Sequence, residues 1–191
     1  MSTTVKILLG LIAGTLLLCV AAGFVGLFLF RSTGMAVSNL VKTDPEHAVR
    51  VGSEIAEYDV PEGFPEVFTA KLAGYEMIGY TGSDGHSHIY FFQLPPGVTV
   101  DLSNLESELQ KTFPANAESY LNVRVIDSHP GTIAGQDVTL VISEGTNHDG
   151  ETFREISAAF QGKGGQALVV FSRPTASWDQ AEVDNFLASI R

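Results

Sequence analysis

An apolar run near the N-terminus constrains this chain more than any other feature. It covers 24 residues, from Ile7 to Phe30, and Thr15 is its only conventionally polar member. A helix of that length would span about 36 Å, enough to cross a bilayer core of roughly 30 Å while satisfying its own backbone hydrogen bonds. We therefore expect a transmembrane helix at residues 7–30, preceded by a short tail at residues 1–6.

The alternative interpretation of this run is a cleaved signal peptide. Val20 and Ala22 could supply the small residues of a cleavage site, but apolar residues continue past them to Phe30. The positive charges on the two sides of the run are nearly balanced, so they do not decide the orientation in the membrane. Short N-terminal tails ahead of an anchor, however, commonly stay on the cytoplasmic side. We therefore predict a retained, single-pass signal anchor with an extracytoplasmic domain.

Small residues recur at four-residue spacing within the run. Gly10 and Gly14 form a GxxxG pair, and Ala22 and Gly26 repeat the spacing. Such spacing lets two membrane helices approach closely, although it is also frequent by chance in such helices. A homodimer through the transmembrane helix is therefore one hypothesis for this chain.

The rest of the chain is acidic and lacks cysteine. Residues 46–191 carry 21 Asp and Glu against 8 Lys and Arg, a net charge of −13, and the single cysteine, Cys19, lies within the apolar run. The negative charge repels phosphates, so nucleic acid is not an expected partner. The lack of cysteine excludes a disulfide, a cysteine-based metal site and a cysteine nucleophile from this region.

Residues 31–57 read as a juxtamembrane linker with a short helix, and residues 58–191 as one domain. The helix is expected to have Asp44 as its N-cap and Pro45 as its first residue and to end near Glu57, and it could belong either to the domain or to the stalk. Strands are expected at Val67–Leu72, Glu76–Tyr80, His88–Leu94, Asn122–Ser128, Asp137–Ser143, Phe153–Gln161 and Gln166–Ser172.

Turns and helix caps divide these strands. Turns are expected at Ser83–Gly85 and at Pro130-Gly131 with Gly135. Ser103 and Glu106 form a capping box ahead of an amphipathic helix, and Ser177 is the expected N-cap of the last helix. Hairpin-linked strands with interspersed helices predict an α+β fold, an antiparallel sheet flanked by helices.

Three short motifs carry a family resemblance. They are Y-x-V-P-E-G at residues 58–63, A-G-Q at residues 134–136 and the final helical segment at residues 178–191. With the order of elements, they make the domain resemble the PsbP-like and DcrB-like α/β/α sandwich families, without a close match to one protein. The resemblance implies a non-catalytic accessory protein, often membrane-associated and extracytoplasmic, and it carries over no functional residue.

Two histidines form the main candidate for a metal site. His86 and His88 are two residues apart at the start of an expected strand, so both would point to one face. Imidazoles placed in this way suit Cu(II), Ni(II) or Zn(II). The alternative is a pair of solvated turn histidines. A third ligand would have to come from His148, Asp149, His129, Asp84 or a neighbouring carboxylate.

The sequence holds no complete catalytic constellation. Ser87 lies beside His86, but neighbouring side chains on a strand face opposite ways, so the hydroxyl cannot easily use either flanking imidazole. We therefore expect a non-catalytic domain, without a required cofactor, that binds or scaffolds another envelope component. A metal-binding protein holding Cu or Zn is the alternative, and an unrecognised enzyme is the third reading.

Overall fold

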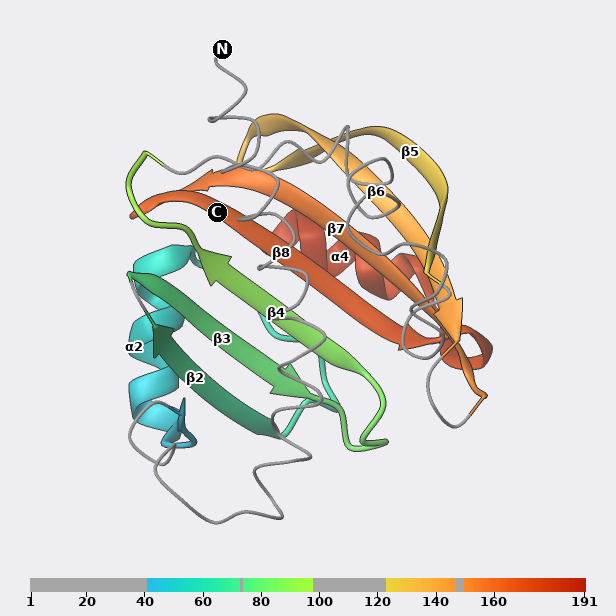
Figure 1. Ribbon diagram of the computed structural model, residues 1–191, viewed down its shortest axis with the longest axis horizontal. Helices are drawn as coiled ribbons and strands as arrows, with labels where there is room; N and C mark the ends of the chain where they lie inside the picture. The colour runs from blue at the N-terminus through green and yellow to red at the C-terminus, as the bar shows by residue number, and fades with distance from the viewer. Residues whose placement is uncertain (1–40, 73, 98–122, 147–149) are drawn as a thin grey trace, which may run out of the picture. The chain divides into compact units, whose positions relative to one another are not determined.

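Antiparallel strands form one continuous sheet in the computed structural model, which describes residues 41–72, 74–97, 123–146 and 150–191. The eight strands follow the order β1-β2-β3-β4-β8-β7-β6-β5, with every neighbouring pair antiparallel (Figure 1). They are β1 (Val41–Lys42), β2 (Glu66–Leu72), β3 (Tyr75–Thr81), β4 (His88–Gln93), β5 (Arg124–Ile133), β6 (Gln136–Thr146), β7 (Thr152–Gly162) and β8 (Gly165–Pro174). The described helices are α2 (Pro45–Ile55), α4 (Gln180–Ser189) and the 3-10 turn η2 (Thr175–Ser177). The α+β prediction is confirmed.

The strand at the β5 edge differs from the prediction. A turn was expected at Pro130-Gly131, but β5 continues through both residues and pairs with β6 as far as Ile133. Because β5 is the last strand of the sheet, the missing N–H of Pro130 can face away from the ladder. The turn lies at Ala134 and Gly135, which both have positive φ, so the prediction is correct for Gly135 and wrong for Pro130-Gly131.

The last helix is confirmed, but its predicted N-cap is wrong. Asp179, not Ser177, caps α4, because its carboxylate accepts hydrogen bonds from the amides of Ala181 and Glu182. Ser177 lies in η2, and its hydroxyl donates to the carbonyl of Pro174. Both residue types favour the N-cap position, and only tertiary structure decides between them.

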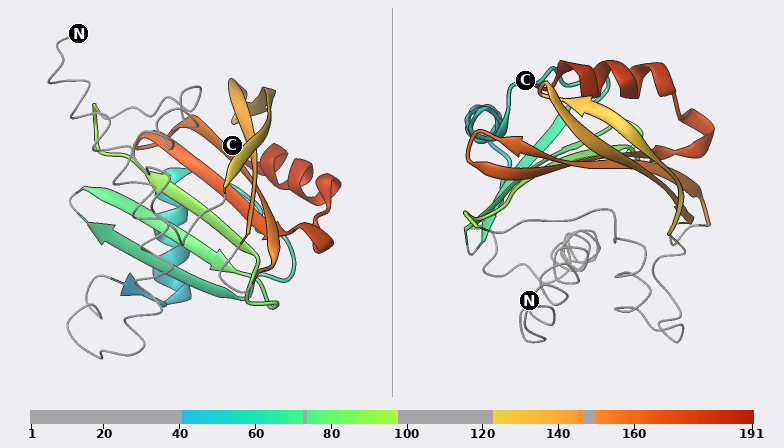
Figure 2. Two further views of the ribbon diagram at one scale, coloured as in Figure 1. Left: turned by 45° about the vertical axis from the view of Figure 1, so that its right-hand side comes forward. Right: turned by 90° about the horizontal axis from the view of Figure 1, so that it is seen from above.

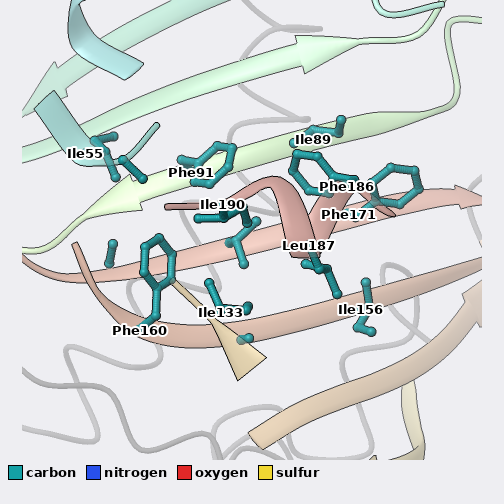
Figure 3. Close-up of a cluster of buried hydrophobic side chains, with 14 of the residues drawn as sticks. Ile55, Ile89, Phe91, Ile133, Ile156, Phe160, Phe171, Phe186, Leu187 and Ile190 are labelled. Atoms are coloured by element: carbon teal, nitrogen blue, oxygen red, sulfur yellow. The ribbon is translucent and has the colours of Figure 1, made fainter. Parts of the chain in front are cut away.

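Both described helices pack on one face of the sheet (Figure 2). Apolar side chains between the helices and the sheet form a single core (Figure 3). The helix α2 contributes Ala48, Val51 and Ile55 to this core. The sequence alone did not decide whether this helix belongs to the domain or to the stalk, and these contacts place it in the domain. Each large side chain that is fully buried contributes about 1.5–3 kcal/mol.

Backbone hydrogen bonds fasten the end of α2 to distant parts of the chain. Glu57 and Arg191 exchange two of them, with N···O distances of 3.0 and 2.8 Å. The amide of Lys163, in the β7–β8 turn, donates to the carbonyl of Ile55 at 2.9 Å. The C-terminus and this turn therefore hold α2 in place.

Several predictions fall outside the described residues. They are the transmembrane helix at residues 7–30 with Gly10, Gly14, Ala22 and Gly26, and the helix expected after the capping box at residues 103–106. Among the helices that the structure describes, none is long and apolar enough to span a membrane.

Candidate functional site

The two histidines of the predicted metal site lie at the β3–β4 hairpin, but in different surroundings. Gly85 has a φ of 72°, which confirms the tight turn. His86 follows it on the surface, with Nδ1 3.4 Å from Oε2 of Glu151. His88 begins β4 and is only 9% exposed. One imidazole is therefore open to solvent and the other is inside the protein.

The environment of His88 keeps its imidazole neutral. Burial lowers the pKa to about 4, against a raising effect of the charge on Asp84 and with a small lowering effect of His86. A neutral imidazole is the form that binds metals. Within the described ranges, however, no three His, Cys, Asp or Glu side chains gather around a common point. His129 bonds to Asp127 instead.

His148, the third proposed ligand, lies outside the residues that the structure describes. The His86–His88–His148 site therefore stays a prediction.

Ser87, between the two histidines, is a buried structural residue. It is 1% exposed, and its hydroxyl donates to Oδ2 of Asp84 at 2.6 Å. The same hydroxyl accepts a hydrogen bond from Nε of Arg173 at 3.2 Å. Asp84 also accepts bonds from the amides of His86 and Ser87. The hydroxyl is thus enclosed by partners and is not placed to attack a substrate.

Arg173 extends this network from the hairpin to the helix layer. Its guanidinium makes two hydrogen bonds to the carboxylate of Glu182 on α4. It also lies 5.6 Å from the ring centroid of Phe64 and 5.4 Å from that of Phe171. We call Asp84, Ser87, Arg173 and Glu182 the hairpin network. It joins the β3–β4 hairpin, β8 and α4.

A second group of polar side chains lies on the other face of the sheet. We call the face opposite α2 and α4 the second face. Cross-strand neighbours share a face, and the pairings place Thr81 beside His88, His88 beside Ser172, Ser172 beside Glu155, and Glu155 beside Ser143. These five residues form a continuous row across β3, β4, β8, β7 and β6, which we call the polar row.

Glu155 is the titratable centre of the polar row. Burial raises the pKa of its carboxyl from 4.5 to about 7. Burial, and then the charge of Glu155, also raise the pKa of Tyr90, which lies one row further along the second face. Strongly shifted groups of this kind mark places where ionisation can be used.

The sequence analysis found His88 but not the rest of the polar row. Each member is a single polar residue in a different strand, and only the strand register aligns them. A search for alternating polarity within β7 or β8 would not have shown the row, because it needs the pairing between strands.

Comparison with known proteins gives a likeness of fold. No family model matches the sequence, and no curated protein matches it. Among solved structures, the chain is similar to the solution structure of cyanobacterial PsbP (CyanoP) from Synechocystis sp. PCC 6803. The alignment covers 79% of this chain and 90% of that chain, with a TM-score of 0.51 and 12% identity. The chain has a PsbP-like fold. At 12% identity this likeness shows the fold alone. It confirms the PsbP-like fold that the sequence motifs suggested.

Proposed function

We propose that this chain is a non-catalytic accessory protein, anchored in a membrane by residues 7–30, whose domain binds another envelope component. The observation that carries the non-catalytic part is the hairpin network. Ser87 is the serine that lies beside His and Asp residues in the sequence, as a nucleophile would. Its hydroxyl is hydrogen-bonded to Asp84 and Arg173 and is buried, so it is not available for attack. The PsbP-like fold supports the accessory role.

The anchor and the charge support the binding part of the proposal. A membrane tether raises the effective concentration of the domain near membrane partners without any added contact. The net charge of the whole chain is −11, which favours a partner that presents cationic groups.

Three preparations of the protein test this proposal: the full chain, a chain lacking residues 1–30, and the full chain with Ile78→Asp. Ile78 is 0% exposed, so the charge should unfold the domain and leave the anchor intact. We expect the full chain to resist alkaline carbonate extraction and to co-purify with a defined partner from its native membrane. The Ile78→Asp chain should stay in the membrane but lose the partner. Release in carbonate, or equal recovery of the partner by the unfolded variant, would refute the proposal.

A metal-binding envelope protein is the second candidate. The neutral, buried imidazole of His88 and the carboxylate of Glu151 beside His86 favour it. His86, His88 and His148 would hold Cu(II) or Zn(II) at the hairpin. Metal titration separates this function from the first, because partner binding by the accessory domain requires no metal.

A further inference from the structure

The C-terminal end of α2 is built without the local caps that helices commonly carry. The helix ends at Ile55, and the chain continues from Ala56 in an extended conformation instead of turning through a left-handed glycine. Residues 52–55, its last turn, contain no Lys, Arg or His to complement the negative end of the helix dipole. The last backbone carbonyls of α2 therefore need partners from elsewhere in the chain.

Lys163, in the β7–β8 turn, is the partner of two of these carbonyls. Its backbone amide donates to the carbonyl of Ile55 at 2.9 Å, and its Nζ donates to the carbonyl of Ser53 at 3.1 Å. The same Nζ donates to Oε1 of Glu57 at 3.0 Å, just beyond the helix. One residue from a distant turn thus caps α2 with hydrogen bonds and places a positive charge at its C-terminal end.

Glycines on both sides of Lys163 allow the turn to come this close to the helix. A Cβ atom at Gly162 would lie 2.7 Å from the carbonyl oxygen of Ile55. A Cβ atom at Gly164 would lie 3.0 Å from Oε1 of the buried Gln93. Larger residues would push the turn away from α2, so the Gly-Lys-Gly sequence fits the capping role of Lys163.

The other attachments of α2 are limited. It packs against β2, β3 and β4 through Ala48, Val51 and Ile55, whereas Val49 on its outer side is 70% exposed. A helix of 11 residues is not stable in water without tertiary contacts. Elements with few buried contacts open locally at a lower free energy than the rest of a domain.

We propose that Lys163 is a charge-dependent latch for α2, which opens as a unit ahead of the sheet and α4. The two backbone hydrogen bonds between Glu57 and Arg191 hold the chain after the helix during this opening. Opening uncovers the apolar surface under α2, where Cδ1 of Ile78 lies 3.4 Å from the Cβ position of Gly52.

The latch makes the exposure of this surface depend on one ammonium group. The side chain of Lys163 is 47% exposed, so reagents and modifying enzymes reach it. Acetylation removes its charge and would release the latch. The inference rests on contacts within the described part of the chain, so it holds whether or not the proposed accessory function is correct.

Hydrogen–deuterium exchange of the full-length protein tests the latch with two variants at one position. Lys163→Gln removes the charge, and the amides of Val51 and Ile55 should exchange at least about threefold faster than in the parent. Lys163→Arg keeps the charge and should stay within about twofold of the parent. The amides of β8 and α4 should exchange at the parent rate in both variants, because the opening is confined to α2.

Lys71→Gln is the matched control, because it also removes one exposed ammonium group, which pairs with Glu76. It should leave the exchange of α2 unchanged. Salt gives an independent measurement. Raising the ionic strength to about 1 M should bring the exchange of α2 in the parent towards the rate of Lys163→Gln, and should change that variant by less than about twofold.

Four results overturn the proposal. They are equal α2 exchange in the parent and Lys163→Gln, equal acceleration of α2 in Lys163→Arg or Lys71→Gln, an acceleration in β8 and α4 as large as that in α2, and exchange of α2 in the parent as slow as that of β8. The third would mean a general loss of stability, and the fourth would mean that α2 opens only when the whole domain unfolds.

Discussion

The hydroxyl of Ser87 accepts a hydrogen bond from Nε of Arg173 at 3.2 Å, across 86 residues of sequence. This bond joins the β3–β4 hairpin to β8, and the same guanidinium continues to Glu182 on α4. The hairpin that carries His86 and His88 is therefore held by tertiary contacts, and not only by its own turn. The position of both histidines depends on this network.

Replacing Arg173 should destabilise the domain. Arg173→Ala removes the bonds to Ser87 and Glu182 and leaves a partly buried carboxylate without its cation. We expect the free energy of unfolding to fall by about 2–4 kcal/mol, measured by denaturant titration. Lys71→Ala is the matched control, because it breaks an exposed ion pair with Glu76 and should cost less than about 1 kcal/mol. Equal losses in the two variants would show that the network does not stabilise the fold.

The carboxylate of Asp84 should make the domain sensitive to acid. Burial opposes its ionisation, but hydrogen bonds from Ser87 and the amide of His86, with the charge of Arg173, outweigh burial and lower the pKa to about 2 from 3.8. The unfolded chain therefore binds the proton more readily. The ionised carboxylate therefore stabilises the folded state. Its contribution to the free energy of unfolding is complete above about pH 4 and is lost as the pH falls towards 2.

Because Asp84 is exposed, solvent screening limits this contribution to about 1 kcal/mol. Unfolding titrations of the parent protein and of Asp84→Asn at pH values from about 5 to about 2 check the prediction, because this range includes the ordinary pKa of 3.8. The variant should lose less stability across this range. Identical slopes for the two proteins would contradict the assigned role of the carboxylate.

Glu155 should act in the opposite direction. Burial raises its pKa from 4.5 to about 7, so the folded protein holds a proton that the unfolded chain releases. The contribution of Glu155 to the free energy of unfolding should therefore be largest below about pH 4.5 and should fall as the pH rises towards 7. Glu155→Gln keeps the shape of the side chain without the charge. We expect it to be more stable than the parent by about 1–3 kcal/mol at pH 8 and nearly equal at pH 4.5.

Hydrogen–deuterium exchange of β7 and β8 at the two pH values gives a second measurement of this effect. The parent should exchange faster at the higher pH, after correction for the intrinsic rate, and Glu155→Gln should not. Ser157→Ala, on the same face of β7 and 5% exposed, is the matched control and should keep the pH dependence of the parent. If Glu155→Gln shows the same pH dependence as the parent, the carboxyl of Glu155 is not the cause of that dependence.

Local patterns in the sequence were enough to predict most strands, because alternation and turn residues are properties of adjacent positions. Gly85 at the hairpin and the apolar residues of α4 were found in this way. Pro130 was misread as a turn, because its tolerance in β5 depends on the strand being at the edge of the sheet. The polar row and the bond between Ser87 and Arg173 were not predicted, because they depend on register and on distant parts of the chain.

The metal hypothesis makes the last prediction. If the hairpin binds Cu(II) or Zn(II), calorimetric titration of the full-length protein should show binding that disappears in the His86→Ala, His88→Ala double variant. The binding should also weaken as the pH falls, because only an unprotonated imidazole binds the metal. His86→Ala alone is the cleaner variant, since this side chain is exposed and its loss leaves the core intact. His47→Ala, which removes an exposed histidine on α2, is the matched control and should bind as the parent does. Unchanged affinity in the double variant would exclude the pair, and a parent protein that binds neither metal would remove the hypothesis.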